Sequence, residues 1–315
     1  MGLKIVFMGT PEFAVASLDI LIKNNYEVVA VVTVPDKPAG RGQQIQQSAV
    51  KKYALQKGLT ILQPEKLKDE VFINELQALK ADLQIVVAFR MLPEVVWNMP
   101  PHGTYNLHGS LLPKYRGAAP INWAIINGET ESGVTSFKLK HDIDTGNILF
   151  QKKIEISKTA TAGEIHDALM ELGAEVILKT VQAIEGGYYE LKPQDDTQSI
   201  HAPKLFKDTC KIHWNNSAEK IYNLIRGLSP YPAAFTEFID KYNQTLGVKI
   251  FISEMEEINH SFKAGAVMSD GKTFLKVACT NGYIYIKELQ MAGKKRMFVE
   301  EFLRGFKIDS DFKFI

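Results

Sequence analysis

The sequence has little cysteine, no long apolar run and almost no net charge, and each shortage argues against a class of protein. Its two cysteines, Cys210 and Cys279, lie far apart and form no cluster with histidine, which argues against a disulfide framework or a structural metal site. No run of about 18 apolar residues could span a bilayer, so we expect no membrane partner. The net charge of +1 gives no overall sign of a nucleic-acid partner.

The chain contains enough apolar residues to form two hydrophobic cores. Its 315 residues are 45% hydrophobic and 23% charged, which predicts two globular domains that need no metal or disulfide. The segment from Lys4 to Met8 is an apolar strand that begins without a signal-peptide pattern. We therefore expect a cytoplasmic protein.

The charges are unevenly distributed along the chain. Through residue 203 there are 20 Lys and Arg against 23 Asp and Glu, and beyond it there are 17 against 13. A basic C-terminal part suits a domain that meets a polyanion, although a solvated surface of mixed charge explains the difference about as well.

The first part of the chain alternates strands with helices. Apolar strands are predicted at Lys4–Met8, Val28–Thr33 and Leu83–Phe89, with helical segments between them. This order predicts an α/β domain with a doubly wound, Rossmann-like and mostly parallel sheet. The turn at Gly9 precedes Thr10, a possible helix cap, and Pro11, but it does not match the GxGxxG dinucleotide motif.

Turn-forming residue pairs between 186 and 204 predict a connection between domains. We expect a catalytic domain at 1–188, a linker at 189–205 and a smaller domain at 206–315. In the latter, Ser217 can cap a helix that ends before Pro230. Five short strands separated by turns then predict an OB-like β-barrel of a kind that often binds nucleic acid: Ala234–Ile239, Val248–Ser253, Ala264–Met268, Thr273–Cys279 and Tyr283–Leu289.

The segment from Thr104 to Pro120 carries the strongest chemical signal. On a strand, Asn106 and His108 project from one face and present an amide and an imidazole to the same small volume, which can be an oxyanion site. Gly109 then begins a long loop that contains Lys114 and Arg116. The alternative interpretation is structural: His108 is a histidine of the core and Asn106 a neighbouring turn residue. The long loop after His108 weighs against this alternative.

A carboxylate follows in a second segment, Lys140–Gly146. Asp144 comes after an apolar alternating run and can orient His108 or relay a proton. By itself, an aspartate before Gly146 is also an ordinary turn residue.

At these residues the chain resembles the folate-dependent formyltransferases, whose pattern is Asn-x-His-x-Ser-Leu-Leu-Pro followed by Asp-x-Gly. The resemblance implies that Asn106, His108 and Asp144 are catalytic and that 10-formyltetrahydrofolate, a reduced folate, is the formyl donor, with no metal. It also implies a folate site formed by two segments: Ser110, Leu111, Leu112 and Pro113, and Phe89, Arg90 and Met91. The second segment departs from the Tyr-Gly-aliphatic pattern of the family and is one residue shorter, so its folate contacts can differ.

Three further segments resemble the branch of this family that formylates initiator methionyl-tRNA. They are the loop Pro35–Gly42, the sequence Ala202-Pro203-Lys204 and the basic segment Ala292–Met297. The resemblance implies that tRNA is bound by basic residues in these segments: Lys37, Arg41, Lys204, Lys294, Lys295 and Arg296. An ordinary flexible surface connection is the alternative for the Pro35–Gly42 loop.

Two other functions stay open. A formyltransferase that acts on a nucleotide-linked amino sugar would have nearly the same loop after His108, but it would not need the basic loop at residues 35–42. A catalytically silent folate- or RNA-binding module would not need Asn106, His108 and Asp144 together. A glycinamide ribonucleotide enzyme is disfavoured because that family usually lacks a second domain of this size.

Overall fold

The computed structural model describes residues 2–39, 44–239, 244–308 and 312–315 of the chain. The chain forms two compact units. The first comprises Met1–Pro120, Ser132–Ile154 and His166–Ala202, and the second comprises Ile121–Glu131, Glu155–Ile165 and Pro203–Ile315. The division at a linker of residues 189–205 stays a prediction, and the chain from 166 to 202 packs with the first unit.

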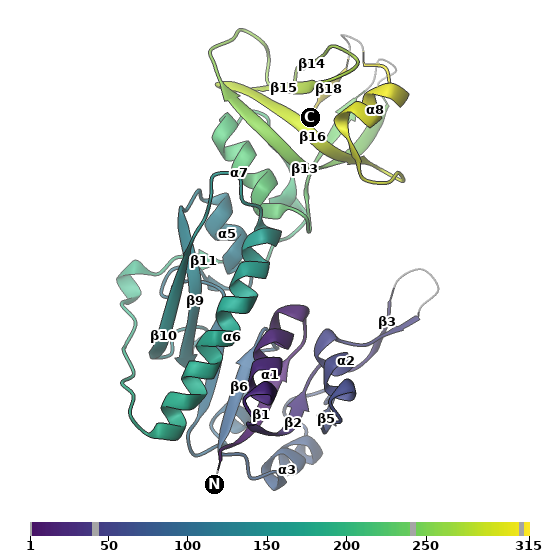
Figure 1. Ribbon diagram of the computed structural model, residues 1–315. Helices are drawn as coiled ribbons and strands as arrows, with labels where there is room; N and C mark the ends of the chain where they lie inside the picture. The colour runs from purple at the N-terminus through teal and green to yellow at the C-terminus, as the bar shows by residue number, and fades with distance from the viewer. Residues whose placement is uncertain (1, 40–43, 240–243, 309–311) are drawn as a thin grey trace. The chain divides into compact units, whose positions relative to one another are not determined.

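A seven-stranded sheet forms the centre of the first unit (Figure 1). Its strands, in spatial order, are β10 (Ile148–Glu155), β9 (Glu131–Lys138), β7 (Thr104–His108), β6 (Leu83–Val87), β1 (Lys4–Gly9), β2 (Glu27–Val32) and β5 (Ile61–Leu62). The pairs from β7 through β5 are parallel, whereas β7 and β9 are antiparallel. The expected Rossmann-like, mostly parallel sheet is confirmed.

Helices cover both faces of this sheet. On one face, α1 (Glu12–Lys23) and α6 (Ala162–Gly186) lie side by side, since the rings of Phe13 and His166 are 5.2 Å apart (Figure 1). On the other face, Phe72 and Leu76 of α3 (Glu70–Ala78) and a valine of α4 (Glu94–Trp97) pack in one apolar cluster with residues from β1, β2 and β6. Apolar side chains on both faces explain why these parallel strands read as continuous hydrophobic runs.

Smaller elements complete the first unit. They are β3 (Lys37–Ala39), β4 (Gln44–Gln46), α2 (Ala49–Gln56), β8 (Arg116–Gly117), β11 (His201–Ala202) and the 3-10 turn Asp196–Gln198. In α1 the N-cap position is Pro11, which forms no side-chain capping bond, so the suggestion that Thr10 caps this helix was wrong. Strand β6 stops at Val87, two residues before the predicted end, because Ala88 turns the chain with a φ of +47°.

The second unit contains an antiparallel sheet that curls into a nearly closed barrel. Its spatial order is β14 (Val267–Ser269), β15 (Leu275–Cys279), β16 (Gly282–Met291), β13 (Thr245–Glu257), β12 (Ala234–Ile239) and β18 (Lys313–Phe314), and β17 (Met297–Phe298) pairs with β16. A bridge between Ala266 and Lys313 joins the two ends of this order. The predicted barrel is therefore confirmed.

Helices fill and cap the barrel. Ser217 caps α7 (Ala218–Leu228) by accepting a hydrogen bond from the main-chain N–H of Lys220, as predicted. The apolar face of α7 and that of α8 (Val299–Gly305) join one buried core with the strands. The second unit also contains α5 (Pro120–Ile126) and the 3-10 turn Asp208–Cys210.

The predicted barrel strands differ from the observed ones mainly in length. Strand β13 is much longer than Val248–Ser253, because its pairing with β16 continues through two irregularities. Strand β14 begins three residues later than predicted, at Val267, because the main chain at Gly265 has a φ of +85°. No helix in the described part of the chain is long and apolar enough to cross a membrane.

Candidate active site

Strand β7 places two polar side chains at the carboxyl edge of the first sheet. Leu107 points toward α6, where a Cβ on Gly173 would come within 2.6 Å of it. Because side chains alternate along a strand, Asn106 and His108 point to the opposite face. Asn106 is half-buried and its amide forms no hydrogen bond with a described residue, whereas His108 is buried. The predicted pairing of these two residues on one face is therefore seen in the structure.

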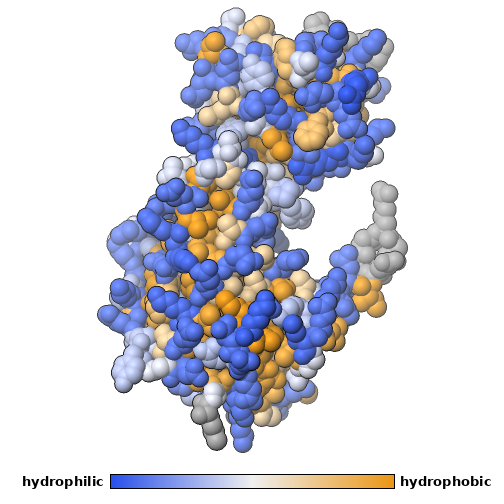
Figure 2. Space-filling view, in the orientation of Figure 1, coloured by the Kyte–Doolittle hydropathy of each residue, from blue (hydrophilic) through white to orange (hydrophobic). Residues whose placement is uncertain are grey.

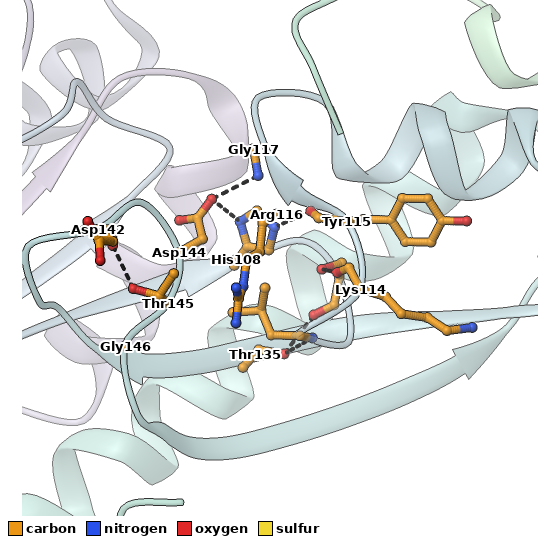
Figure 3. A network of polar contacts seen from close by, with 12 residues as sticks. His108, Lys114, Tyr115, Arg116, Gly117, Thr135, Asp142, Asp144, Thr145 and Gly146 are labelled. Atoms are coloured by element: carbon orange, nitrogen blue, oxygen red, sulfur yellow. Dashed lines mark hydrogen bonds and ion pairs between the residues drawn. The ribbon is translucent and has the colours of Figure 1, made fainter. Parts of the chain in front are cut away.

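His108 is held between a main-chain carbonyl and a carboxylate (Figure 3). Its Nε2 lies 2.8 Å from the carbonyl oxygen of Tyr115, and its Nδ1 lies 3.7 Å from Oδ2 of Asp144. The two side chains are only 7% and 14% exposed. The structure thus brings His108 and Asp144 together, at a separation longer than a direct hydrogen bond.

The carbonyl of Tyr115 fixes the tautomer of the neutral His108 ring. A carbonyl oxygen only accepts hydrogen bonds, so Nε2 of His108 carries a hydrogen and donates it. In the neutral ring Nδ1 then has the lone pair, and it faces Asp144. The carboxylate of Asp144 therefore lies on the side of the ring that can accept a hydrogen.

The turn that carries Asp144 has a demanding backbone. Asp144 has a φ of +54°, and its Oδ2 accepts a hydrogen bond of 2.9 Å from the N–H of Gly117 (Figure 3). Two residues later, a Cβ on Gly146 would lie only 1.8 Å from the carbonyl oxygen of Lys138. The glycine after the aspartate is therefore required by close packing of the main chain.

The loop that follows His108 is fixed by hydrogen bonds within the protein. Ser110 donates from Oγ to the carbonyl of Lys114 at 2.6 Å, and Thr135 donates to the carbonyl of Ser110 at 2.7 Å. Gln151 donates to the carbonyl of Leu112 at 2.8 Å. Ser110 and Leu112 are buried, while Leu111 and Pro113 are partly exposed, so this segment offers apolar side chains and a rigid main chain to a ligand.

The segment expected to line a folate pocket follows β6. Phe89 packs against the apolar cluster beneath the sheet, and Met91 is 71% exposed. The guanidinium of Arg90 donates to the carbonyls of Pro64 and Glu65, at 2.9 and 3.0 Å. Burial lowers the pKa of Arg90. Arg90 thereby uses two of its nitrogens to join this segment to the chain after β5.

The basic loop between β2 and α2 is anchored at its start. Lys51 donates to Asp36 at 2.6 Å and to Gln63 at 2.7 Å, and Gln63 in turn donates to Asp36 at 2.9 Å. The bonds that Asp36 accepts from Lys51 and Gln63 hold its pKa below the ordinary range. Lys51 is thus engaged inside the protein and adds little to a basic surface. Lys37 is exposed on β3, and Arg41 lies outside the described residues.

The basic residues expected to meet tRNA in the second unit differ in their partners. Arg296 pairs with Glu288 through two nitrogens, the first of these bonds being 2.6 Å, and Lys295 lies 3.2 Å from Glu301. Lys204 and Lys294 are exposed and form no ion pair with a described residue. In the view of Figure 2 the surface of this unit is mostly hydrophilic, with scattered apolar residues.

Sequence reasoning missed a glutamine that joins the parts of this site. Gln194 contacts Arg116 and the turn of Asp144, yet it lies in the segment read as a linker. No local pattern in the sequence marks it. Among the described residues there is no cluster of three or more His, Cys, Asp or Glu that could hold a metal ion.

Comparisons with known proteins agree with the motifs. Residues 3–181 match the family described as Formyl transferase, and residues 204–307 match the formyl transferase C-terminal domain. A methionyl-tRNA formyltransferase of Bacteroides fragilis is 54% identical, over 99% of this chain and 97% of that protein. A methionyl-tRNA formyltransferase of Flavobacterium johnsoniae is 55% identical, over 99% of this chain and 98% of that protein.

Solved structures share the fold at lower identity. A sugar 3N-formyltransferase, crystallised with dTDP and 5-N-formyl-THF, superposes with a TM-score of 0.65 at 23% identity, over 94% of this chain and 100% of that one. HypX of Aquifex aeolicus, in complex with tetrahydrofolic acid, superposes with a TM-score of 0.65 at 18% identity, over 98% of this chain and 49% of that one.

Proposed function

The chain belongs to the formyl transferase family, as its motifs indicated, and from this premise we propose that it formylates the amino group of initiator methionyl-tRNA. The proposed donor is 10-formyltetrahydrofolate and the product is N-formylmethionyl-tRNA. Relatives with this activity are more than half identical to the chain over nearly its whole length, which supports the assignment. A cytoplasmic location, where initiator tRNA is used, is part of the proposal.

The observation that carries the proposal is the arrangement of Asn106, His108 and Asp144. Attack of a neutral amine on a formyl carbonyl produces a tetrahedral oxyanion, which needs donors that are already in place. The amide of Asn106 is partly exposed and has no partner among the described residues, so it is available to donate. A donor of this kind typically contributes about 3 to 4 kcal/mol to stabilisation of the transition state.

His108 and Asp144 have the geometry to move protons. An α-amine with a pKa of about 7.7 to 8.0 is largely protonated at pH 7, so a group nearby must accept a proton before or during attack. Nδ1 of His108 is the free ring nitrogen, and the carboxylate of Asp144 lies 3.7 Å away. This pair accepts the proton of the amine and returns one to the leaving nitrogen of the folate.

The residues near this site fit a flat, partly apolar donor. The formyl donor supplies the reactive carbonyl, and the protein provides a pocket wall from the rigid segment Ser110–Pro113 together with Phe89 and Met91. Arg90 acts there by fixing the segment after β6, because its guanidinium is bonded to main-chain carbonyls.

The tRNA is bound by basic residues in both units. Lys37 and Arg41 belong to the loop between β2 and α2. Lys204 lies at the start of the last segment of the second unit, and Lys294, Lys295 and Arg296 follow β16. Phosphate contacts by lysine and arginine give affinity that falls with salt.

A panel of amines tests the proposal directly. The protein is incubated with 10-formyltetrahydrofolate labelled in the formyl group and, separately, with methionyl initiator tRNA, an amino-sugar nucleotide and glycinamide ribonucleotide. We expect turnover with the tRNA. Turnover with the sugar alone would replace the proposed acceptor, and binding of tRNA or folate without turnover would indicate a silent module.

A further inference from the structure

One glutamine in the chain segment after α6 is bonded on two sides. Gln194 is half-buried, although every other residue from 192 to 199 is exposed. Its Nε2 donates to the main-chain carbonyls of Asp144 and Gly146, at 2.8 and 2.7 Å. Its Oε1 accepts from Nε and Nη2 of Arg116, at 3.0 and 2.7 Å. Both donors and both lone pairs of the amide are thus used.

The amide of Gln194 joins two segments of the active site, the turn that carries Asp144 and the loop that contains Arg116 and Gly117. Asp144 adopts a left-handed backbone conformation that costs a residue with a side chain about 1 to 2 kcal/mol, so the turn needs support from its surroundings. Gln194 provides that support by binding two carbonyls of the turn. Arg116 directly precedes Gly117, which donates to the carboxylate of Asp144. One side chain therefore fixes Asp144 through its main chain and through the loop that binds its carboxylate.

The rest of the segment reinforces the same loop. The carbonyl of Ile200 accepts from the N–H of Arg116 at 2.9 Å, and that of Ala202 accepts from the N–H of Ala118 at 2.8 Å. These bonds accompany the parallel pairing of β8 and β11. Asp196 also accepts from Arg116, at 2.6 Å. The segment 194–202 is thus part of the structure around His108 and Asp144.

We propose that Gln194 is a positioning residue for formyl transfer, which holds the carboxylate of Asp144 at its working distance from Nδ1 of His108. This inference rests on the proposed function, because it concerns the same reaction. The 3.7 Å separation exceeds a direct hydrogen bond, so proton transfer depends on where the turn holds the carboxylate. A displacement of about 1 Å by a mutation remote from the chemistry can reduce a rate about 100-fold.

Two substitutions distinguish two roles of Gln194, which are to position Asp144 and to bind the guanidinium of Arg116. Gln194→Glu keeps an oxygen toward Arg116 and adds a charge that strengthens that pair, but it replaces the Nε2 donor with a second oxygen, which presents an acceptor to the carbonyls of Asp144 and Gly146. Gln194→Met removes both sets of bonds. Gln198→Leu is the matched control, because Gln198 lies in the same segment and its side chain, within the described part of the chain, donates only to the carboxylate of Asp195.

Steady-state kinetics with methionyl initiator tRNA give the first readout. We expect kcat to fall about 10- to 100-fold in Gln194→Glu and Gln194→Met, with little change in KM for tRNA, and Gln198→Leu to behave as wild type. Wild-type kcat in Gln194→Glu, or a loss confined to KM, would overturn the inference. Circular dichroism verifies folding, and if Gln194→Met does not fold, the near-isosteric Gln194→Glu decides the question.

A second readout needs no turnover and so separates this inference from the proposed function. The His108 ring resonances are followed by NMR in the full-length protein. They should move in the Gln194 variants and stay in place in Gln198→Leu. Unmoved resonances would overturn the positioning role of Gln194, whatever the turnover experiment shows. Failure of the wild-type protein to formylate any of the amines would overturn the proposed function but would leave the positioning role to be decided by NMR.

Discussion

The Nε2 hydrogen of His108 is donated to the main-chain carbonyl of Tyr115 over 2.8 Å. Tyr115 itself has a φ of +62°, so the loop after β7 turns sharply at the residue that provides this acceptor. The bond fixes both the orientation of the ring and its tautomer. The loop of seven residues after His108 thus orients the imidazole through a main-chain atom rather than through a side chain.

The first prediction concerns proton transfer at His108 and Asp144. His108→Ala or Asp144→Asn should lower kcat at least about 100-fold and leave tRNA affinity nearly unchanged, because these groups act mainly in the transition state. Turnover kinetics and a binding titration with tRNA measure the two quantities separately. An effect on KM alone would contradict the assignment of these residues to the chemical step.

A second prediction follows from the close packing at Gly117. This glycine has a φ of +124°, and a Cβ there would lie 2.5 Å from the carbonyl oxygen of Ala202. Gly117→Ala should destabilise the protein by about 1 to 3 kcal/mol and reduce kcat, since the N–H that binds Asp144 must move. Denaturant unfolding and turnover kinetics measure the two effects.

The matched control for that substitution is Gly186→Ala. Gly186 ends α6, and a Cβ there would meet no atom within 4 Å. We expect unchanged kcat and unchanged or slightly higher stability, because alanine favours a helix more than glycine does. If both variants lose stability equally, the steric argument at Gly117 is wrong.

A third prediction compares two basic residues of the second unit. Lys294→Ala should reduce the slope of log K for tRNA against log salt by about 0.7 to 0.9, the value for one phosphate contact. Arg296→Ala should change the slope less, since its guanidinium is already paired with Glu288. Binding titrations at several salt concentrations give the slopes.

The control for these two variants removes a charge at a distance from the catalytic site. Lys80 is exposed just before β6, at the amino end of the parallel strands, and has a φ of +49°, which asparagine tolerates well. Lys80→Asn should leave the slope unchanged. If it lowers the slope as much as Lys294→Ala does, the effect is one of net charge rather than of contact.

Local patterns in the sequence predicted those parts of the fold that depend on near neighbours. The strand Ala234–Ile239 has the predicted bounds, and Ser217 caps α7 through a bond that spans three residues. The pairing of Asn106 with His108 also needed only the two-residue period of a strand.

The sequence could not reveal contacts between residues far apart in the chain. The bonds of Gln194 to Asp144 and Arg116 span 50 and 78 residues, and the surrounding polar sequence looks like an ordinary linker. Likewise, the bridge from Ala266 to Lys313 that closes the barrel joins two short segments without a distinctive pattern. Such contacts are determined by tertiary packing, which local propensity does not encode.

The final prediction separates tRNA from a sugar acceptor and concerns Arg41. The loop that contains it is anchored at Asp36 by Lys51 and Gln63, and its flanks pair as β3 and β4. We expect Arg41→Ala to lower kcat/KM for methionyl-tRNA severely, because it removes a contact that helps to place the amine against the formyl carbon. Arg41→Lys keeps the charge but loses the planar guanidinium, so partial rescue would indicate phosphate attraction and no rescue would indicate bidentate or stacking contact. The measurement is kcat/KM for the three proteins at one salt concentration, with folding verified by circular dichroism. Equal values would remove the loop from the mechanism and favour a small acceptor bound beside Asn106 and His108, which does not need a basic loop.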